Sequence, residues 1–176
     1  MSKTLEILRS EHQVMDRLLG ILEHQIDLFE KAEGADYELL KEIVDYFLTI
    51  PDLYHHPKED LIYLRLRRRA AGDMHDIPAE HEGISERLHA FSRALISVLM
   101  DEEYPREQFV EIARKFLDGE RRHMKGEERE FFPMAEKSLT EEDWSEIDAR
   151  VSRFKDPLMH GDTTYRFQAI RDELEE

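Results

Sequence analysis

Apolar residues recur at alternating intervals of three and four along most of this 176-residue chain. In the first such segment the positions are held by Leu5, Leu8, His12, Met15, Leu19, Leu22, Ile26 and Phe29. This spacing is typical of a helix that packs one face against others, and the alternation expected of strands is absent. Only 7 Gly and 6 Pro residues interrupt the chain. The pattern therefore predicts an all-α fold.

Four long segments share this spacing. We expect them to be helices over residues 3–31, 37–71, 78–100 and 106–137. Pro51 and Pro57 fall inside the second segment, and each removes a backbone donor, so a kink or a restart is expected between them. Four long helices with short connections bury their apolar faces as an antiparallel, up-down-up-down four-helix bundle.

The C-terminal part of the chain lies outside these four segments. Thr140 and Asp143 have the spacing of a capping box, which predicts the start of a short helix. We expect Trp144 to pack this helix in place. The sequence thus predicts a bundle over residues 1–137 and a C-terminal helical extension over residues 138–176 that packs on the bundle.

Charge and composition exclude several classes of protein. With 25 basic and 41 acidic residues, the formal net charge is −16. This balance argues against nucleic-acid binding and against electrostatic attachment to an anionic membrane. The longest uncharged run, residues 94–100, is too short to span a bilayer, and the N-terminus lacks the apolar region of a signal peptide, so a cytoplasmic location is expected. The chain has no Cys, so any metal ion must be held by nitrogen and oxygen.

Polar side chains interrupt the apolar face of every long segment. The residues at these core positions are His12, His55, His81 and His123, with Glu59, Glu120 and Glu127. Burying several carboxylates without partners would cost more than the roughly 5–15 kcal/mol by which a typical domain is stable. Something must therefore neutralise them.

The polar core residues also repeat along the chain. In each half a single His is followed, after nearly the same interval, by a His-x-x-x-Glu pair, His55–Glu59 in the first half and His123–Glu127 in the second. This spacing places an imidazole and a carboxylate one turn apart on the same helix face. The chain resembles two helix pairs, each of which supplies one single His and one His/Glu pair.

The other five His residues are expected to face solvent. His24 and His89 lie off the apolar face of their segments, and His75 and His160 lie in expected loops. His56 directly follows a core His and so points about 100° away from it on a helix.

Four imidazoles and two carboxylates are too many ligands for one tetrahedral zinc ion and too rich in nitrogen for calcium or magnesium. Two metal ions that share two bridging carboxylates fit this set, because each ion then has two His and a share of both Glu. Imidazole combined with carboxylate in a bundle core is typical of di-iron sites.

The order of these residues resembles the hemerythrin-like (HHE cation-binding) family. The resemblance covers roughly residues 1–137 and rests on His12, on His55-His-Pro-Lys-Glu59-Asp, on Glu80-His81, and on His123-x-x-x-Glu127 followed by Phe131-Phe-Pro133. It implies two iron ions joined by an oxo or hydroxo bridge. The implied ligands are His12 and His55 for one iron, His81 and His123 for the other, and Glu59 and Glu127 as bridges.

One position departs from the oxygen-carrying members of that family. Those members have a fifth His one turn after the ligand in the third helix, and this chain has Ser85 there. The chain therefore looks more like the four-His, two-Glu members that handle nitric oxide, iron or oxidative stress.

Two functions are compatible with such a site. One is binding of a small diatomic ligand, O₂ or NO, or handling of iron, for sensing, storage or stress response. The other is a di-iron redox enzyme that consumes peroxide or NO. Tyr54, next to His55, is either a packing residue or a hydrogen-bond donor to the bound ligand.

A ferritin-like ferroxidase is a further alternative, because Glu86–His89 and Glu120–His123 have the Glu-x-x-His spacing of that fold. We expect Glu120 instead to be a hydrogen-bond partner of a ligating His. The metalloprotease motif His-Glu-x-x-His is absent, since His81-Glu82 lacks the second His.

Overall fold

The computed structural model describes residues 2–69, 76–100, 103–154, 156, 158 and 167–175. Every regular element within these ranges is a helix, which confirms the all-α expectation. The α-helices are α1 (Lys3–Lys31), α2 (Tyr37–Ile50), α3 (His56–Arg69), α4 (Ile77–Leu99), α5 (Arg106–Gly126), α6 (Phe132–Ser138), α7 (Glu141–Val151) and α9 (Gln168–Glu175). Two short π-helical turns are η1 (Pro51–His55) and η2 (Glu127–Phe131).

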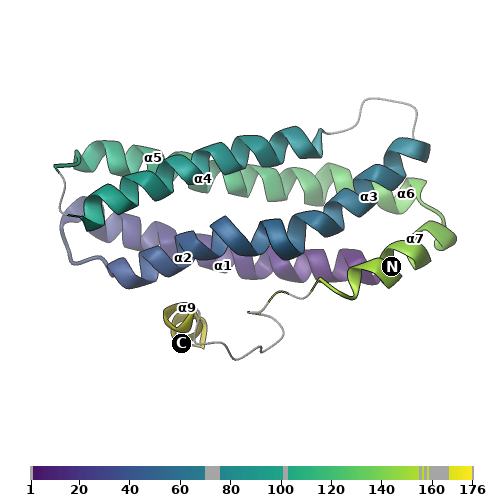
Figure 1. The fold of residues 1–176 in the computed structure, drawn as a ribbon, viewed down its shortest axis with the longest axis horizontal. Helices are drawn as coiled ribbons and strands as arrows, with labels where there is room; N and C mark the ends of the chain where they lie inside the picture. Colours follow the sequence, from purple (N-terminus) through teal and green to yellow (C-terminus); the bar gives the residue numbers. More distant parts are fainter. Residues whose placement is uncertain are drawn as a thin grey trace.

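The long helices lie side by side along the long axis of the molecule (Figure 1). α2, η1 and α3 form one continuous run, and α5, η2 and α6 form another. α1 and α4 both contact these two runs. α7 packs against α1 and α3, and α9 packs against α2. No helix in the described ranges is both long enough and apolar enough to cross a membrane.

The expected kink in the second segment is a widened turn rather than a break. The His56 N–H donates to the carbonyl oxygen of Pro51, five residues earlier, where an α-helix would use the fourth. Pro51 is the first residue of this turn and, as expected, supplies no backbone N–H to the helical hydrogen bonds. The second π turn, at Glu127–Phe131, was not expected from the sequence. There the Phe132 N–H donates to the Glu127 carbonyl oxygen.

The helix starts follow the expected capping chemistry. The Asp36 side chain accepts from the backbone N–H groups of Glu38 and Leu39 at the start of α2. Thr140 and Asp143 form the predicted capping box at the start of α7. Trp144 packs, partly buried, against the apolar residues beneath α7.

Two apolar clusters fill the interior. The larger includes Leu22, Phe47, Phe91 and Phe116, and is joined by Phe167 and Ile170 from the C-terminal part of the chain. The smaller is formed by Leu5, Leu8, Ile62, Leu66, Ile77, Phe131, Phe132, Ala135, Leu139, Ile147 and Val151. Along α1 the second cluster ends at Leu8 and the first begins at Met15, so His12 lies between them. The other core His and Glu residues occupy the same boundary, which makes it a polar layer between two apolar clusters.

Candidate metal centre

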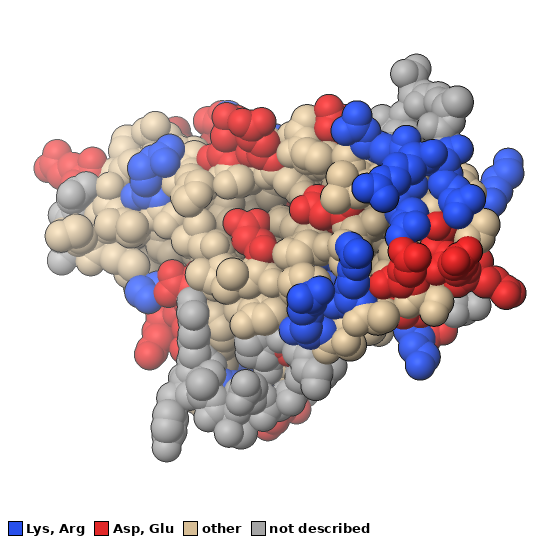
Figure 2. All heavy atoms as spheres, turned by 45° about the vertical axis from the view of Figure 1, so that its right-hand side comes forward, with Lys and Arg blue, Asp and Glu red and all other residues tan. Residues whose placement is uncertain are grey.

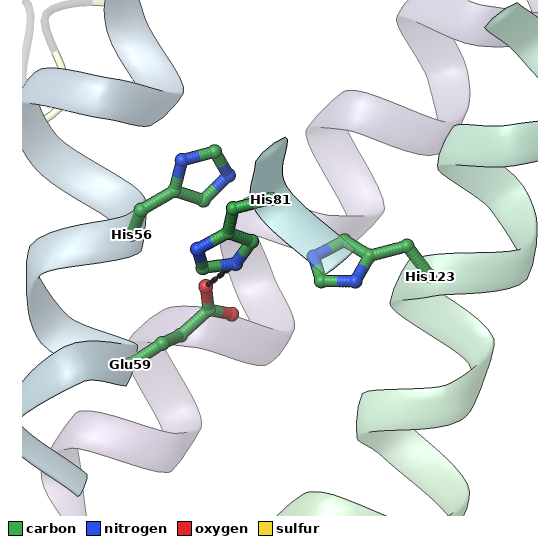
Figure 3. A group of neighbouring side chains, drawn as sticks. All are labelled: His56, Glu59, His81 and His123. Carbon is green, nitrogen blue, oxygen red and sulfur yellow. Dashed lines mark ion pairs between the residues drawn. The ribbon is translucent and has the colours of Figure 1, made fainter. Parts of the chain in front are cut away.

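The polar layer brings together the six residues that the resemblance implies as ligands and, in addition, His56. They form two groups, whose ligand atoms lie within 4.8 Å of one another in each group. The first group contains His12, His55, Glu59 and Glu127, and the second contains His56, Glu59, His81 and His123. Figure 3 shows the second group, in which side chains from α3, α4 and α5 converge on one point. Glu59 belongs to both groups.

Glu59 directs one oxygen to each group. Its Oε1 lies 3.0 Å from His55 Nε2, and its Oε2 lies 3.2 Å from His81 Nε2. The carboxylate is completely buried. Burial alone would raise the pKa of Glu59, but the neighbouring His55 lowers that pKa well below its usual value. The same contact, with Glu11 adding to it, raises the pKa of His55 to about 10 despite burial.

Glu127 spans the layer in the same way. Its Oε2 lies 3.3 Å from His12 Nε2, and its Oε1 lies 3.4 Å from His123 Nε2. Burial, and then the negative charge of Glu59, raise the pKa of Glu127 well above its usual value. Two carboxylates in one buried layer thus disfavour each other's charge, and cations placed between them would relieve this repulsion.

Four of the imidazoles each form a hydrogen bond to a carboxylate through Nδ1. In each case Nδ1 donates, at 2.8–3.0 Å, and the pairs are His12 with Glu128, His55 with Glu11, His56 with Asp52, and His123 with Glu80. In the neutral form of each ring, these bonds favour the tautomer that leaves Nε2 without a proton. The same carboxylate–imidazole pairing is typical of metal-bound His.

Several buried atoms of the layer have no hydrogen-bond partner among the described residues. They are both side-chain oxygens of Glu59 and of Glu127, and Nε2 of His81 and of His123. Some of these atoms lie within ion-pair distance of one another, but not in hydrogen-bonding geometry. Because buried polar atoms are almost always paired, the layer requires a further partner, and a set of imidazole nitrogens and carboxylate oxygens fits metal cations.

The prediction that His56 faces solvent is wrong. Its side chain is only 14% exposed, and its ring stacks on that of His81, with centroids 3.8 Å apart. Each long helix borders two neighbours, so two adjacent residues can both point inward, towards different helices. His55 faces α1 and His56 faces α4. Burial lowers the pKa of His56 to about 4, although Asp52 opposes this, so the imidazole is neutral at pH 7.

The expected role of Glu120 as a partner of a ligating His is not what the structure shows for His123. The hydrogen bond from His123 Nδ1 goes to Glu80 on α4. Glu120 is buried, and its Oε2 has no hydrogen-bond partner among the described residues. Burial raises the pKa of Glu120, which favours its protonated form. Tyr54 is partly buried against the larger apolar cluster, as a packing residue would be.

The remaining His residues divide into two sets. His24 and His89 are exposed, as expected from their positions off the apolar face. His75 and His160 lie outside the described residues. The sequence did not reveal the carboxylates that accept a hydrogen bond from these imidazoles, because most of them lie on a different helix from the imidazole they hold. We call them the anchoring carboxylates; they are Glu11, Asp52, Glu80 and Glu128. The exception is Asp52, four residues before His56, which a search for i, i+4 pairs could have found.

Packed helices around a buried layer of imidazole and carboxylate donors define a helical metal-binding protein. The family model of the hemerythrin HHE cation-binding domain matches residues 3–135, and the chain belongs to that family. This confirms the resemblance found in the sequence. No curated protein matches the chain.

Proposed function

We propose that this protein binds two iron ions in the polar layer and uses them to bind O₂ or NO, or to handle iron, for sensing, storage or stress response. The observation that carries the proposal is the orientation of Glu59 and Glu127. Each directs one carboxylate oxygen to each of the two groups. Two cations, one in each group, would therefore share both carboxylates.

The proposed ligands of the first ion are His12 and His55, and those of the second are His81 and His123. His56 is proposed as a third imidazole for the second ion. Two observations support this addition. Its ligand atom lies with the others of the second group, and its Nδ1 is held by a carboxylate like those of the other imidazoles. His56 would thus supply from α3 a ligand that Ser85 on α4 cannot supply.

A small cavity beside the second group supports a small ligand. Its lining includes His56, His81, Ser85 and Glu120, together with apolar residues such as Phe116. About 20 Å³ is available to a water-sized molecule, somewhat more than the roughly 10–15 Å³ that one water needs. A molecule of one or two heavy atoms fits this space. Iron bound in the layer would supply redox chemistry.

A redox enzyme that consumes peroxide or NO is the second candidate, because the same cavity would admit those molecules. The ferritin-like alternative is disfavoured. It requires Glu86 and His89 at the centre, and both side chains are exposed.

We also propose the antiparallel, up-down-up-down arrangement and a division into a bundle over residues 1–137 and an extension over residues 138–176. The support is that each helical run starts at the end of the molecule where the run before it stops (Figure 1). Contacts of α7 with α1 and α3, and of α9 with α2, support packing of the extension on the bundle.

The first test is anaerobic loading with Fe(II), followed by elemental analysis and absorption spectra with O₂, NO and peroxide. We expect about two irons per chain, since two groups of ligands are present. A stable adduct would favour binding, and rapid steady-state consumption would favour catalysis. One zinc ion, or no metal after loading with iron, would contradict the proposal.

The ligand assignment is tested by His12→Leu and His81→Leu. Each is expected to lower the iron content by at least about one ion per chain while circular dichroism stays helical, because each removes a ligand of a different group. The matched controls His24→Gln and His89→Gln change exposed His residues and should retain both ions. Full loading of both Leu variants would reject the assignment.

A further inference from the structure

An ion pair lies in the interior beside the first group. The side chains of Lys58 and Glu11 are 0% and 1% exposed. Lys58 Nζ donates to Glu11 Oε1, and the other oxygen of Glu11, Oε2, accepts from His55 Nδ1 at 2.9 Å. Ammonium, carboxylate and imidazole thus form a continuous chain that ends at His55 Nε2 in the polar layer.

This pair is poorly explained by stability alone. Removing both charges from water is costly, and well-packed apolar residues of similar volume are often at least as stabilising as a buried ion pair. Breaking such a pair by removing one partner is far more damaging, since it leaves a buried charge uncompensated. The position of Lys58 next to Glu59 on α3 instead connects the pair to the polar layer.

The other three anchoring carboxylates are in a different environment. Glu80, Glu128 and Asp52 are 34%, 35% and 65% exposed. Glu128 also has a cation, Arg9, at 3.3 Å, but that side chain is 30% exposed. Solvent screens such contacts. Among these four carboxylates, Glu11 is the one shielded from water and paired with a cation that is itself fully buried.

We propose that Lys58 is a positioning residue for the metal centre and acts through Glu11. By engaging Oε1, its ammonium keeps Glu11 as the hydrogen-bond acceptor of His55 and prevents that oxygen from becoming a metal ligand. The rotamer and tautomer of His55 are thereby held, so Lys58 and Glu11 tighten metal binding at the position formed by His12 and His55. This inference rests on the proposed metal-binding function.

The test is a double-mutant cycle of Lys58→Met and Glu11→Gln. Both substitutions nearly preserve shape, and Fe(II) affinities of both positions are measured anaerobically by competition with a chelator. Each single variant is expected to weaken the position of His12 and His55, identified as the one lost in His12→Leu, about 10–100-fold, the usual cost of losing a residue that orients a metal ligand. The double variant should be no worse than the weaker single variant, because the two residues act in series. The position of His81 and His123 should change less than about threefold.

Lys41→Met is the matched control, since Lys41 is an exposed lysine paired with Asp45 on the molecular surface, and both affinities should be unchanged. The melting temperature of each metal-free variant separates positioning from folding, because a purely structural role lowers it and leaves the affinities as they were. If Lys58→Met does not fold, the isosteric Glu11→Gln decides by itself.

Three results would overturn the inference. These are affinities within about threefold of the wild type in both single variants, additive effects in the double variant, and equal weakening of both positions. If the wild-type protein binds no pair of irons, the proposed function fails instead, and the two failures are therefore distinguishable.

Discussion

Asp143 links two elements through a single carboxylate. It accepts from Thr140 at the start of α7 and forms ion pairs with Arg65 and Arg69 of α3. Figure 2 shows basic and acidic side chains gathered side by side at one end of the molecule. Burial alone would raise the pKa of Asp143, but the hydrogen bonds from Thr140 and Arg69 lower it to about 2.

We predict that Asp143→Asn lowers the free energy of unfolding by about 1–3 kcal/mol at pH 7, because hydrogen bonds to a charged group are lost and two guanidinium groups lose their partner. The folded-state pKa lies below the ordinary value of 3.8. The stabilisation is therefore fully present above that value and is lost as the pH falls towards about 2.

Urea unfolding of both proteins across this pH range measures the effect. The difference between wild type and variant should shrink as the pH falls from about 4 to about 2. A difference that does not depend on pH would show that the carboxylate charge is not responsible.

At the scale of elements, the π turns coincide with the polar layer. His55 is the last residue of η1, and Glu127 is the first residue of η2. π turns are rare and occur often at functional sites. η1 lies where α2, which packs in the larger apolar cluster, passes into α3, which packs in the smaller one. The widened turn is thus placed where two consecutive His residues face different helices.

α2 also holds the C-terminal part of the chain. The hydroxyl of Tyr46, a fully buried residue, donates to Asp156 Oδ2 at 2.8 Å, and Phe167 packs edge-on against the Tyr46 ring. We predict that Tyr46→Phe lowers the free energy of unfolding by about 1–3 kcal/mol, because the buried carboxylate of Asp156 loses a donor. Limited proteolysis should also cleave the chain beyond residue 151 faster.

The control for this prediction is Tyr37→Phe, which alters a tyrosine that is 42% exposed and should change neither measurement. Stability and cleavage equal to those of the wild type in Tyr46→Phe would show that this hydrogen bond does not hold the C-terminal part.

For the whole molecule, the polar layer separates two apolar clusters and contains buried atoms that have no hydrogen-bond partner among the described residues. Cations bound there would stabilise the folded chain, since the unfolded chain offers no assembled site. At a free Fe(II) concentration of 100 times the dissociation constant, one position contributes about 2.7 kcal/mol. For a chain of this size we predict a rise in melting temperature of about 5–10 °C.

Anaerobic differential scanning calorimetry with and without Fe(II) measures this rise. His81→Leu should show a smaller rise, and His24→Gln should retain the full effect. An unchanged melting temperature in protein that elemental analysis shows to be loaded would contradict the prediction.

The local features of this protein were predictable from its sequence. Helix positions, the capping box at Thr140 and the core-facing positions of His12, His55, His81 and His123 all depend on spacings of a few residues. Such spacings decide which side chains share a helix face, because the geometry of one turn of helix does not depend on the rest of the fold.

Only the tertiary structure decided which helix each side chain meets. The geometry of one helix alone places His56 about 100° from His55 and so in solvent. It lies inward because α4 borders α3 and its ring stacks on His81. Glu80 holds His123, and Lys58 reaches Glu11, across separations of 43 and 47 residues. A periodic pattern defines one face of one helix, whereas the partners of that face follow from how the helices are packed together.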